Sequence, residues 1–360
     1  MNKDSKPETV NSLRSSTHYV MGVQLGDIIP AREIRLENLA NKRIAIDMYN
    51  TLYQFLTIIR GADGRPLMDA KGRITSHLSG IFYRTCNFLS AGLKPIYVFD
   101  GEPPKIKREE AERRKMLREE ASKKYEEALA TGRVEEARKY AQMSATLDEY
   151  LIQSAERLIS LMGIPVVHAP SEGEAQAAHM VSTGVADYVG SQDFDSLLFG
   201  GKMLVRNLAI TGRRKLPGKK AYVEVNPEEI SLEETLKMLA ITREQLIDIA
   251  LLVGTDYTEG IKGIGPKRAL DLVRSGLSLE DVFKKYGEDL SKVSRYYEAR
   301  EFFLHPQVKD LGELEWRDID EDGVIRFLHD EHDFSLDRIA KAIEEVKKKK
   351  PAEGALSKWF

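Results

Sequence analysis

Short runs of β-branched residues alternate with stretches of helical pattern through much of this 360-residue chain. The runs are KRIAID (42–47), PIYVFD (95–100), IPVVHA (164–169) and DYVGSQD (187–193), with KMLVRN and AYVEVN after them. Strands that alternate with helices pair in parallel, because a parallel connection has to cross over the sheet. We therefore predict an α/β fold with a mostly parallel central sheet flanked by helices. Beyond Asn226 the pattern is helical to about Val346.

A long charged segment separates the second and third predicted strands. Its pattern predicts two or more helices, broken near Ala130, Thr131 and Gly132. The first helix, from Lys105 to about Glu127, has almost no apolar residues and therefore no face to bury. Apolar residues return at helical spacing from about Asp148. We expect the first helix to project from the body of the protein.

Carboxylates follow four successive predicted strands. In an open parallel sheet, ligands bind beyond the carboxyl ends of the strands, so these side chains should share one crevice. Each carboxylate alone could cap a turn or a helix, and Ser171 with Glu174 has the spacing of a capping box. Together they would repel one another strongly unless cations are present. The acids are Asp47, Asp100, Glu172, Glu174, Asp193 and Asp195, with Asp256 after a later apolar helix.

Ligand chemistry narrows the choice of cation. The single cysteine, Cys86, cannot form a thiolate site with a second cysteine, and we expect it to be a small core residue. Carboxylates with few histidines favour hard ions, magnesium or manganese. Two such ions roughly 4 Å apart can activate water and stabilise the leaving oxygen of a phosphodiester. Spacing alone therefore supports a two-metal phosphatase or nuclease.

Basic and aromatic residues lie where a nucleic acid could meet the crevice. Lys107 and Arg114 begin the projecting segment, although they could equally be part of a solvated helix. Gly263 and Gly265 predict a tight turn before a helix that begins at Pro266, where backbone N–H groups can hold a phosphate, and Lys267 and Arg268 add positive charge. Tyr53 follows Asp47 on the next helix and could stack on a base or pack in the core.

Overall composition is typical of a globular protein, with 42% hydrophobic and 31% charged residues. The net charge of −3 excludes a uniformly basic nucleic-acid binder but allows separate acidic and basic patches. There is no apolar run of about 18 residues, and the first twenty residues lack the apolar stretch of a secretory signal. We expect a cytosolic protein that does not enter a membrane.

Taken together, these motifs resemble those of the flap endonucleases of the 5′-nuclease superfamily, in the archaeal form. The resemblance covers roughly residues 21–345 and rests on KRIAIDMYNTLYQFL, KPIYVFDGEPPKIK, LMGIPVVHAPSEGEAQAA, SQDFDSLLFG and LLVGTDYTEGIKGIGPKRA. It implies a PIN-like nuclease fold with a helical arch over the active site and a helix-two-turn-helix clamp on duplex DNA. It also implies that the protein is monomeric on its own and acts on branched DNA with a 5′ flap.

Site residues follow from the same resemblance. The seven acids match the family's metal ligands, Lys107 and Arg114 match the pair that stabilises the scissile phosphate, and Tyr53 matches the stacking tyrosine. The implied cofactors are two Mg²⁺, with Mn²⁺ as a substitute, and K⁺ at the helix-two-turn-helix. The implied DNA contacts are Gly22, Tyr53, Arg60, Arg84, Gly263, Gly265, Lys267 and Arg268.

The two ends of the chain carry further expectations. Residues 1–20 are polar and aperiodic, and the resemblance begins at Met21, so we treat them as an extension that is not native or is disordered. The tail, residues 346–360, resembles a box that binds the sliding clamp, proliferating cell nuclear antigen, with Leu356, Trp359 and Phe360 as anchors, although Glu353 replaces the usual glutamine. An archaeal protein of this kind would be cytoplasmic, in the nucleoid, and a eukaryotic one nuclear.

A single nuclease domain is expected over residues 21–345. It comprises an N-terminal nuclease region (about 21–126), an arch (about 102–147), an internal nuclease region (about 140–280) and C-terminal helices (about 281–345).

The resemblance implies removal of 5′ flaps, and 5′-3′ exonuclease activity, in Okazaki-fragment maturation and long-patch base excision repair. The alternatives are a related 5′ exonuclease or repair nuclease, a non-catalytic DNA-binding scaffold, and a small-molecule two-metal phosphatase.

Overall fold

A seven-stranded sheet forms the centre of the computed structural model, which describes residues 23–61, 65–133, 136, 140, 147–215 and 222–349. The strand order is β1-β9-β6-β5-β2-β3-β4. Neighbours from β6 to β4 pair in parallel, whereas β9 pairs antiparallel with β6 and with β1. The predicted mostly parallel sheet is confirmed. The strands are β1 (Arg32–Glu33), β2 (Arg43–Asp47), β3 (Lys94–Phe99), β4 (Val166–His168), β5 (Tyr188–Gly190), β6 (Met203–Arg206) and β9 (Glu228–Ser231).

Two expectations about strands were wrong. The run AYVEVN forms β8 (Tyr222–Val225), but this strand pairs with β7 (Gly212–Lys215) in a separate two-stranded sheet. The helical region does not begin directly after Asn226, because β9 comes first and pairs with β6. A four-residue strand with one buried apolar residue, Ile230, carries too little periodicity to be recognised, and its backbone pairing with β6 decides its structure.

Residues of the central strands alternate between two hydrophobic cores. In β2, Ile44 and Ile46 pack into one core while Ala45 packs into the other. In β3, Tyr97 belongs to the first core and Val98 to the second. Strands buried on both faces in this way read as continuous apolar runs in the sequence.

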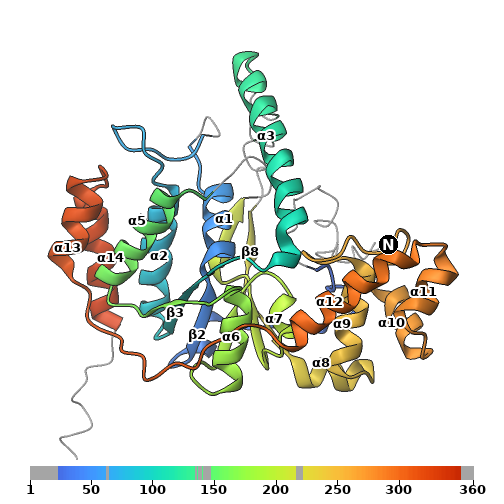
Figure 1. Cartoon of the computed structure of the whole chain (residues 1–360). Coiled ribbons are helices and arrows are strands. Elements are labelled where there is room, and N and C mark those ends of the chain that lie inside the picture. The colour runs from blue at the N-terminus through green and yellow to red at the C-terminus, as the bar shows by residue number, and fades with distance from the viewer. Residues whose placement is uncertain are drawn as a thin grey trace, which may run out of the picture.

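The first core is covered by helices on one side of the sheet (Figure 1). These are α1 (Met48–Ile58), α2 (Ser76–Ser90), α5 (Glu149–Leu161), α13 (Glu321–Ile325), η6 (Arg326–Asp330) and α14 (Leu336–Lys349). The predicted core position of Cys86 on α2 is confirmed, since its side chain is buried and burial raises the pKa of its thiol to about 12.

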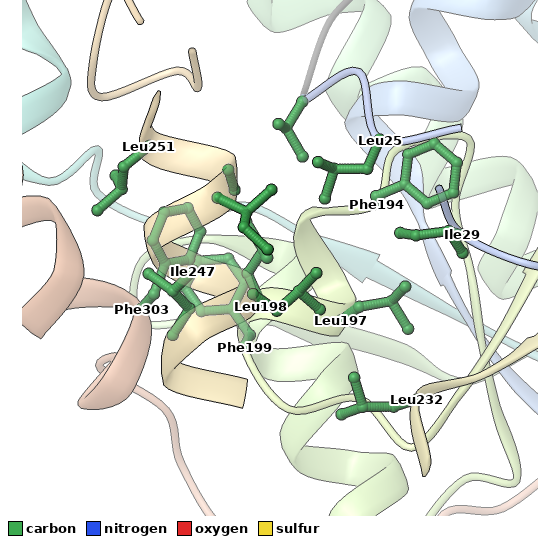
Figure 2. Packing of buried hydrophobic residues seen from close by; sticks show 14 of the residues in the cluster. Leu25, Ile29, Phe194, Leu197, Leu198, Phe199, Leu232, Ile247, Leu251 and Phe303 are labelled. Atoms are coloured by element: carbon green, nitrogen blue, oxygen red, sulfur yellow. The ribbon is translucent and has the colours of Figure 1, made fainter. Parts of the chain in front are cut away.

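The second core joins the sheet to the C-terminal helices. Figure 2 shows Leu197 and Leu198 between Leu25 on one side and Ile247 of α9 on the other, all in one buried cluster. Phe199 packs on Phe303 with ring centroids 4.9 Å apart. This packing fixes α9 and its neighbours beside the carboxyl ends of the strands. The helices are α6 (Gly173–Ser182), α7 (Asp195–Leu198), α8 (Leu232–Leu239), α9 (Arg243–Val253), α10 (Pro266–Arg274), α11 (Leu279–Tyr286) and α12 (Val293–Leu304).

The first part of the charged segment forms the long helix α3 (Arg108–Ala130), which stands out from the body as predicted (Figure 1). It follows the short helix η3 (Lys105–Lys107) and ends before the turn at Gly132, whose φ is 68°. The chain returns to the core with α5, where the Asp148 side chain accepts a hydrogen bond from the Leu151 amide at 2.8 Å. Within the described residues, no helix has the length and apolar character needed to cross a membrane.

Candidate active site

The first four acids lie at the ends of three adjacent strands, as the sequence predicted. Asp47 ends β2 and also caps α1, because its Oδ1 accepts from the Asn50 amide at 3.1 Å. Asp100 follows β3, and its Oδ1 accepts from the Gly173 amide at 2.7 Å. A Cβ at Gly173 would lie 2.6 Å from that oxygen, so only glycine allows this approach. Glu172 and Glu174 occupy the N-terminus of α6.

Glu174 is not part of a capping box. The N-cap residue of α6 is Glu172, and its side chain makes no capping hydrogen bond. The Glu174 side chain instead accepts from the Ser191 hydroxyl at 2.6 Å, just after β5. The capping explanation therefore fails for Glu174, and its carboxylate is directed toward the other acids.

The remaining acids approach from β5 and from the turn after α9. The Asp193 carboxylate accepts from the Asn50 side-chain amide at 2.6 Å. Asp195, the first residue of α7, accepts from the Val23 amide at 3.1 Å. The Asp256 carboxylate lies 3.5 Å from the Lys107 ammonium. The fold thus brings together acids that lie far apart in the sequence.

Burial and mutual repulsion disfavour the charged forms of these acids. Burial, with a contribution from Glu172, raises the pKa of Asp47 to about 6, and burial together with Asp256 raises that of Asp195 to about 7. Burial and neighbouring carboxylates raise the pKa of Asp100, Glu174 and Asp193 well above the ordinary value. These shifts identify a cluster that is short of positive charge.

Lys107 supplies positive charge inside this cluster. Its Nζ lies 2.8 Å from Glu172 Oε2 and 5.9 Å from the centre of the Tyr257 ring. Burial by itself would lower the pKa of Lys107, but the carboxylates of Glu172, Asp256 and Asp100 raise it, so the side chain is an ammonium ion. Lys107 thus lies beside the acids, and its predicted contact with a phosphate stays a prediction.

The acidic cluster suits hard divalent cations. In the part of the chain that the structure describes, no three His, Cys, Asp or Glu side chains converge closely enough to hold an ion as they stand. The donors are nevertheless all carboxylate oxygens, which Mg²⁺ and Mn²⁺ prefer, and their charge is only partly balanced by Lys107. The cation chemistry predicted from the sequence therefore fits the residues that the fold assembles.

The predicted glycine turn lies directly after Asp256. Gly263 has a φ of 84°, Gly265 is the N-cap residue of α10, and Pro266 is its first residue. Both glycines, Lys267 and Arg268 lie at the surface, and the Arg268 guanidinium donates to the Gly263 carbonyl at 2.8 Å. The N-terminus of α10 is thus exposed, and the binding of a phosphate there stays a prediction.

Other predicted contacts lie on α1, just after it, and on α2. Tyr53 is half-buried on α1. The Arg60 side chain donates to the Thr57 carbonyl at 3.1 Å, and that of Arg84 donates to the Thr211 carbonyl at 2.9 Å. Burial lowers the pKa of both guanidinium groups. The side chain of Arg114, and the residues Gly22, Leu356, Trp359 and Phe360, lie outside the described part of the structure.

Three polar residues at the cluster were not predicted as site residues from the sequence. Asn50, Gln54 and Ser191 form hydrogen bonds to the acids or to each other. One signal was present, since Asn50 and Gln54 lie three and seven residues after Asp47 and therefore share a helix face with it.

Comparisons with known proteins agree with this geometry. The family described as "XPG N-terminal domain" matches residues 21–121, and the one described as "XPG I-region" matches residues 163–256. Flap endonuclease 1 of Pyrococcus furiosus is 57% identical over 344 residues, which cover 94% of this chain and 99% of the relative. Flap endonuclease 1 of Ignicoccus hospitalis is 58% identical over 332 residues, with coverages of 91% and 94%.

Solved structures extend the likeness to three dimensions. Flap endonuclease-1 from Methanococcus jannaschii has a TM-score of 0.71 and 45% identity, and the match covers 91% of this chain and 98% of that structure. The catalytic core of Rad2 in complex with DNA substrate has a TM-score of 0.65 and 25% identity, with coverages of 89% and 97%.

Proposed function

The chain belongs to the flap endonuclease family, and on that basis we propose that its seven clustered acids serve the hydrolysis of DNA at the base of a 5′ flap. It is a structure-specific endonuclease, a hydrolase of phosphodiester bonds that acts in DNA replication and repair, and its family depends on divalent metal. Cleavage assisted by two metal ions, in Okazaki-fragment maturation and long-patch base excision repair, is typical of this family.

One observation carries the assignment of roles. Carboxylates that follow four strands, and one from the turn after α9, cluster near the ammonium group of Lys107, which contacts Glu172 and Asp256. We assign Asp47, Asp100, Glu172, Glu174, Asp193, Asp195 and Asp256 as the metal ligands. Magnesium is the proposed ion, with manganese as a substitute. When bound, the ions would activate water and neutralise the charge of the attacked phosphate.

Lys107 and Arg114 are proposed to hold the scissile phosphate. Lys107 already lies among the acids, so a phosphate entering the cluster would meet its ammonium. Arg114 follows seven residues later on α3, two turns up the helix from Lys107. Their positive charge would stabilise the negative charge that develops on the phosphate oxygens.

Duplex DNA is proposed to lie along the turn before α10. Backbone amides at the start of α10, with Lys267 and Arg268, would contact phosphates without reading the sequence. The same turn, with Gly263 and Gly265, is the proposed place for K⁺. Tyr53 is proposed to stack on a base beside the cut, and Gly22, Arg60 and Arg84 are proposed as further DNA contacts.

Further proposals concern partners and organisation. We propose that Leu356, Trp359 and Phe360 bind a sliding clamp, that the enzyme is monomeric on its own, and that it acts in the cytoplasm. We also propose one nuclease domain over residues 21–345, with an extension at 1–20 and a tail at 346–360.

A cleavage assay tests the proposed site. Labelled double-flap DNA is incubated with the protein and Mg²⁺, with and without a chelator, alongside gapped and bubble duplexes. We expect cutting at the flap base that the chelator abolishes, and a loss of at least about 100-fold in Asp193→Asn. The matched control is Glu315→Gln, an exposed acid outside the cluster. Unchanged cleavage and metal binding in Asp193→Asn would remove that residue from the proposed site.

A further inference from the structure

Asn50 connects two of the acids through one short side chain. Its backbone amide donates to Asp47 Oδ1 at 3.1 Å, and its side-chain Nδ2 donates to Asp193 Oδ2 at 2.6 Å. Asn50 itself is buried in the first turn of α1. Since Asp47 caps this same turn, a shift of the start of α1 would disturb both carboxylates together.

Gln54 fixes the orientation of the Asn50 amide. Its Nε2 donates to Asn50 Oδ1 from one turn further along α1. A carboxylate that binds a cation is ionised and can only accept hydrogen bonds, so Asp193 in that form requires the NH₂ group of Asn50 to face it. The Asn50 oxygen must then face Gln54, which has an NH₂ group to offer. The chain of donors therefore runs in one direction, from Gln54 through Asn50 to Asp193.

The surroundings of Gln54 Oε1 are compatible with this direction of hydrogen bonding. Gln54 Oε1 is buried and has no hydrogen-bond partner among the described residues. Gln54 lines a small pocket of about 10 Å³ together with Arg84 and Gln192. A pocket of this size holds about one water molecule, which can donate to Oε1 while Nε2 stays bonded to Asn50.

We propose that Asn50, oriented by Gln54, is a positioning residue that holds the Asp193 carboxylate ready for a divalent cation. The hydrogen bond occupies Asp193 Oδ2 and restrains rotation of the carboxylate, which leaves Oδ1 for a cation. Because the amide is neutral, it orients the carboxylate without competing for the place of a cation, unlike the Lys107 ammonium. Partners that orient metal ligands typically change metal affinity or activity by about 10- to 100-fold when they are removed. The inference rests on the proposed role of Asp193 as a metal ligand.

Manganese affinity of the DNA-free protein provides the test, measured from the electron paramagnetic resonance signal of free Mn²⁺. We expect Asn50→Ala to weaken binding by about tenfold or more. Gln54→Glu should also weaken it, because the new carboxylate would attract the Asn50 NH₂ group and turn the amide oxygen toward Asp193. The added negative charge by itself would strengthen cation binding, so the two explanations predict opposite signs. Asn50→Ala with Gln54→Glu should bind Mn²⁺ no more weakly than Asn50→Ala alone if both residues act through one chain, because only the effect of the added charge then remains.

Controls separate this inference from the proposed function. Asn226→Ala removes an asparagine that donates to another carboxylate, Glu33, at 2.8 Å and outside the cluster, and it should leave Mn²⁺ binding unchanged. Asp193→Asn should bind Mn²⁺ more weakly. If it does so while Asn50→Ala binds like the original protein, the positioning role is wrong and the ligand role stands. If Asp193→Asn binds normally, the ligand role itself is wrong.

Folding of each variant is checked by circular dichroism and thermal unfolding. If Asn50→Ala does not fold, Gln54→Glu and Gln54→Met carry the test, since both leave Asn50 in place. Stronger Mn²⁺ binding in Gln54→Glu, or unchanged binding in both Gln54 variants, would overturn the proposed orientation.

Discussion

Lys107 illustrates how one side chain can have a structural and a chemical role in the same place. Its ammonium contacts Glu172 and Asp256, so it partly balances the buried carboxylates in the protein without metal. The same position would place it against a bound phosphate.

Replacing Lys107 with methionine should therefore slow cleavage. Methionine keeps most of the length of the side chain but removes its charge, and we expect single-turnover cleavage of a flap substrate to fall by about 100-fold or more. Lys105→Met is the matched control, because Lys105 is exposed on the same short helix. Equal effects of the two substitutions would show that general positive charge matters rather than the contact with the acids.

His77 is a buried titratable group away from the active site. Its Nε2 lies 2.8 Å from the Ser154 hydroxyl, which itself donates to the Tyr150 carbonyl at 2.6 Å, so the hydroxyl accepts from Nε2–H. Its Nδ1 is buried and has no hydrogen-bond partner among the described residues. Burial lowers the pKa of His77 from 6.5 to about 3, with a contribution from His332, and the native ring is neutral.

Acid should destabilise the protein through His77. Between pH 6.5 and about 3 the unfolded chain binds a proton on this ring that the native protein does not, so stability falls as the pH falls. In that window the loss is about 1.4 kcal/mol per pH unit. His77→Gln can still donate to Ser154 but cannot titrate, so its unfolding free energy should depend less on pH. Urea denaturation of both proteins at about pH 7 and about pH 5 measures this, and parallel pH dependences would contradict the assignment.

At the level of elements, the turn between α9 and α10 combines an acid of the cluster with the proposed duplex contact. The Ile261 amide donates to the Leu252 carbonyl at 2.9 Å, which folds the turn back on the end of α9. Gly260 has a φ of 71°, and a Cβ there would lie 2.3 Å from the Val253 carbonyl oxygen. The turn therefore requires glycine at this position for both space and conformation.

Gly260→Ala should distort this turn and weaken duplex binding. Gly276 is the matched control, because it has a similar φ of 78° but nothing within 4 Å of the place where a Cβ would lie. Gly276→Ala should cost about 1–2 kcal/mol from its left-handed conformation alone. Gly260→Ala should cost more, and thermal unfolding with fluorescence anisotropy on a labelled duplex measures both effects. Equal losses of stability would show that the close carbonyl moves aside easily.

At the level of the whole molecule, the acids join parts of the chain that would otherwise repel one another. They come from the end of β2, the loop after β3, α6, the loop after β5, α7 and the turn after α9. Cations that bind between them should stabilise the native protein, since the unfolded chain has no such cluster.

Removal of divalent metal should therefore lower thermal stability. A ligand present at about 100 times its dissociation constant adds about 2.7 kcal/mol to the unfolding free energy, and we expect Mg²⁺ or Mn²⁺ to raise the Tm by a few degrees over chelated protein. Asp193→Asn should show a smaller rise. The same rise in both proteins would indicate that the ions bind elsewhere.

The amino-acid sequence by itself determined the class of fold and the family of candidate ligands. Apolar runs such as 95–99 predict strands buried on both faces, and a carboxylate after each run is then expected at one edge of the sheet. The almost apolar-free segment from Lys105 has no face to bury, so its projection also follows from local composition.

Tertiary structure alone decided the rest. The places of β8 and β9 depend on backbone pairing with β7 and β6, which no local pattern records. The Glu174 carboxylate accepts a hydrogen bond from Ser191 rather than from the start of its own helix. Asn50 donates to Asp193, which lies 143 residues away in the sequence. Such contacts depend on where side chains from distant segments end, and only packing of the complete chain fixes those positions.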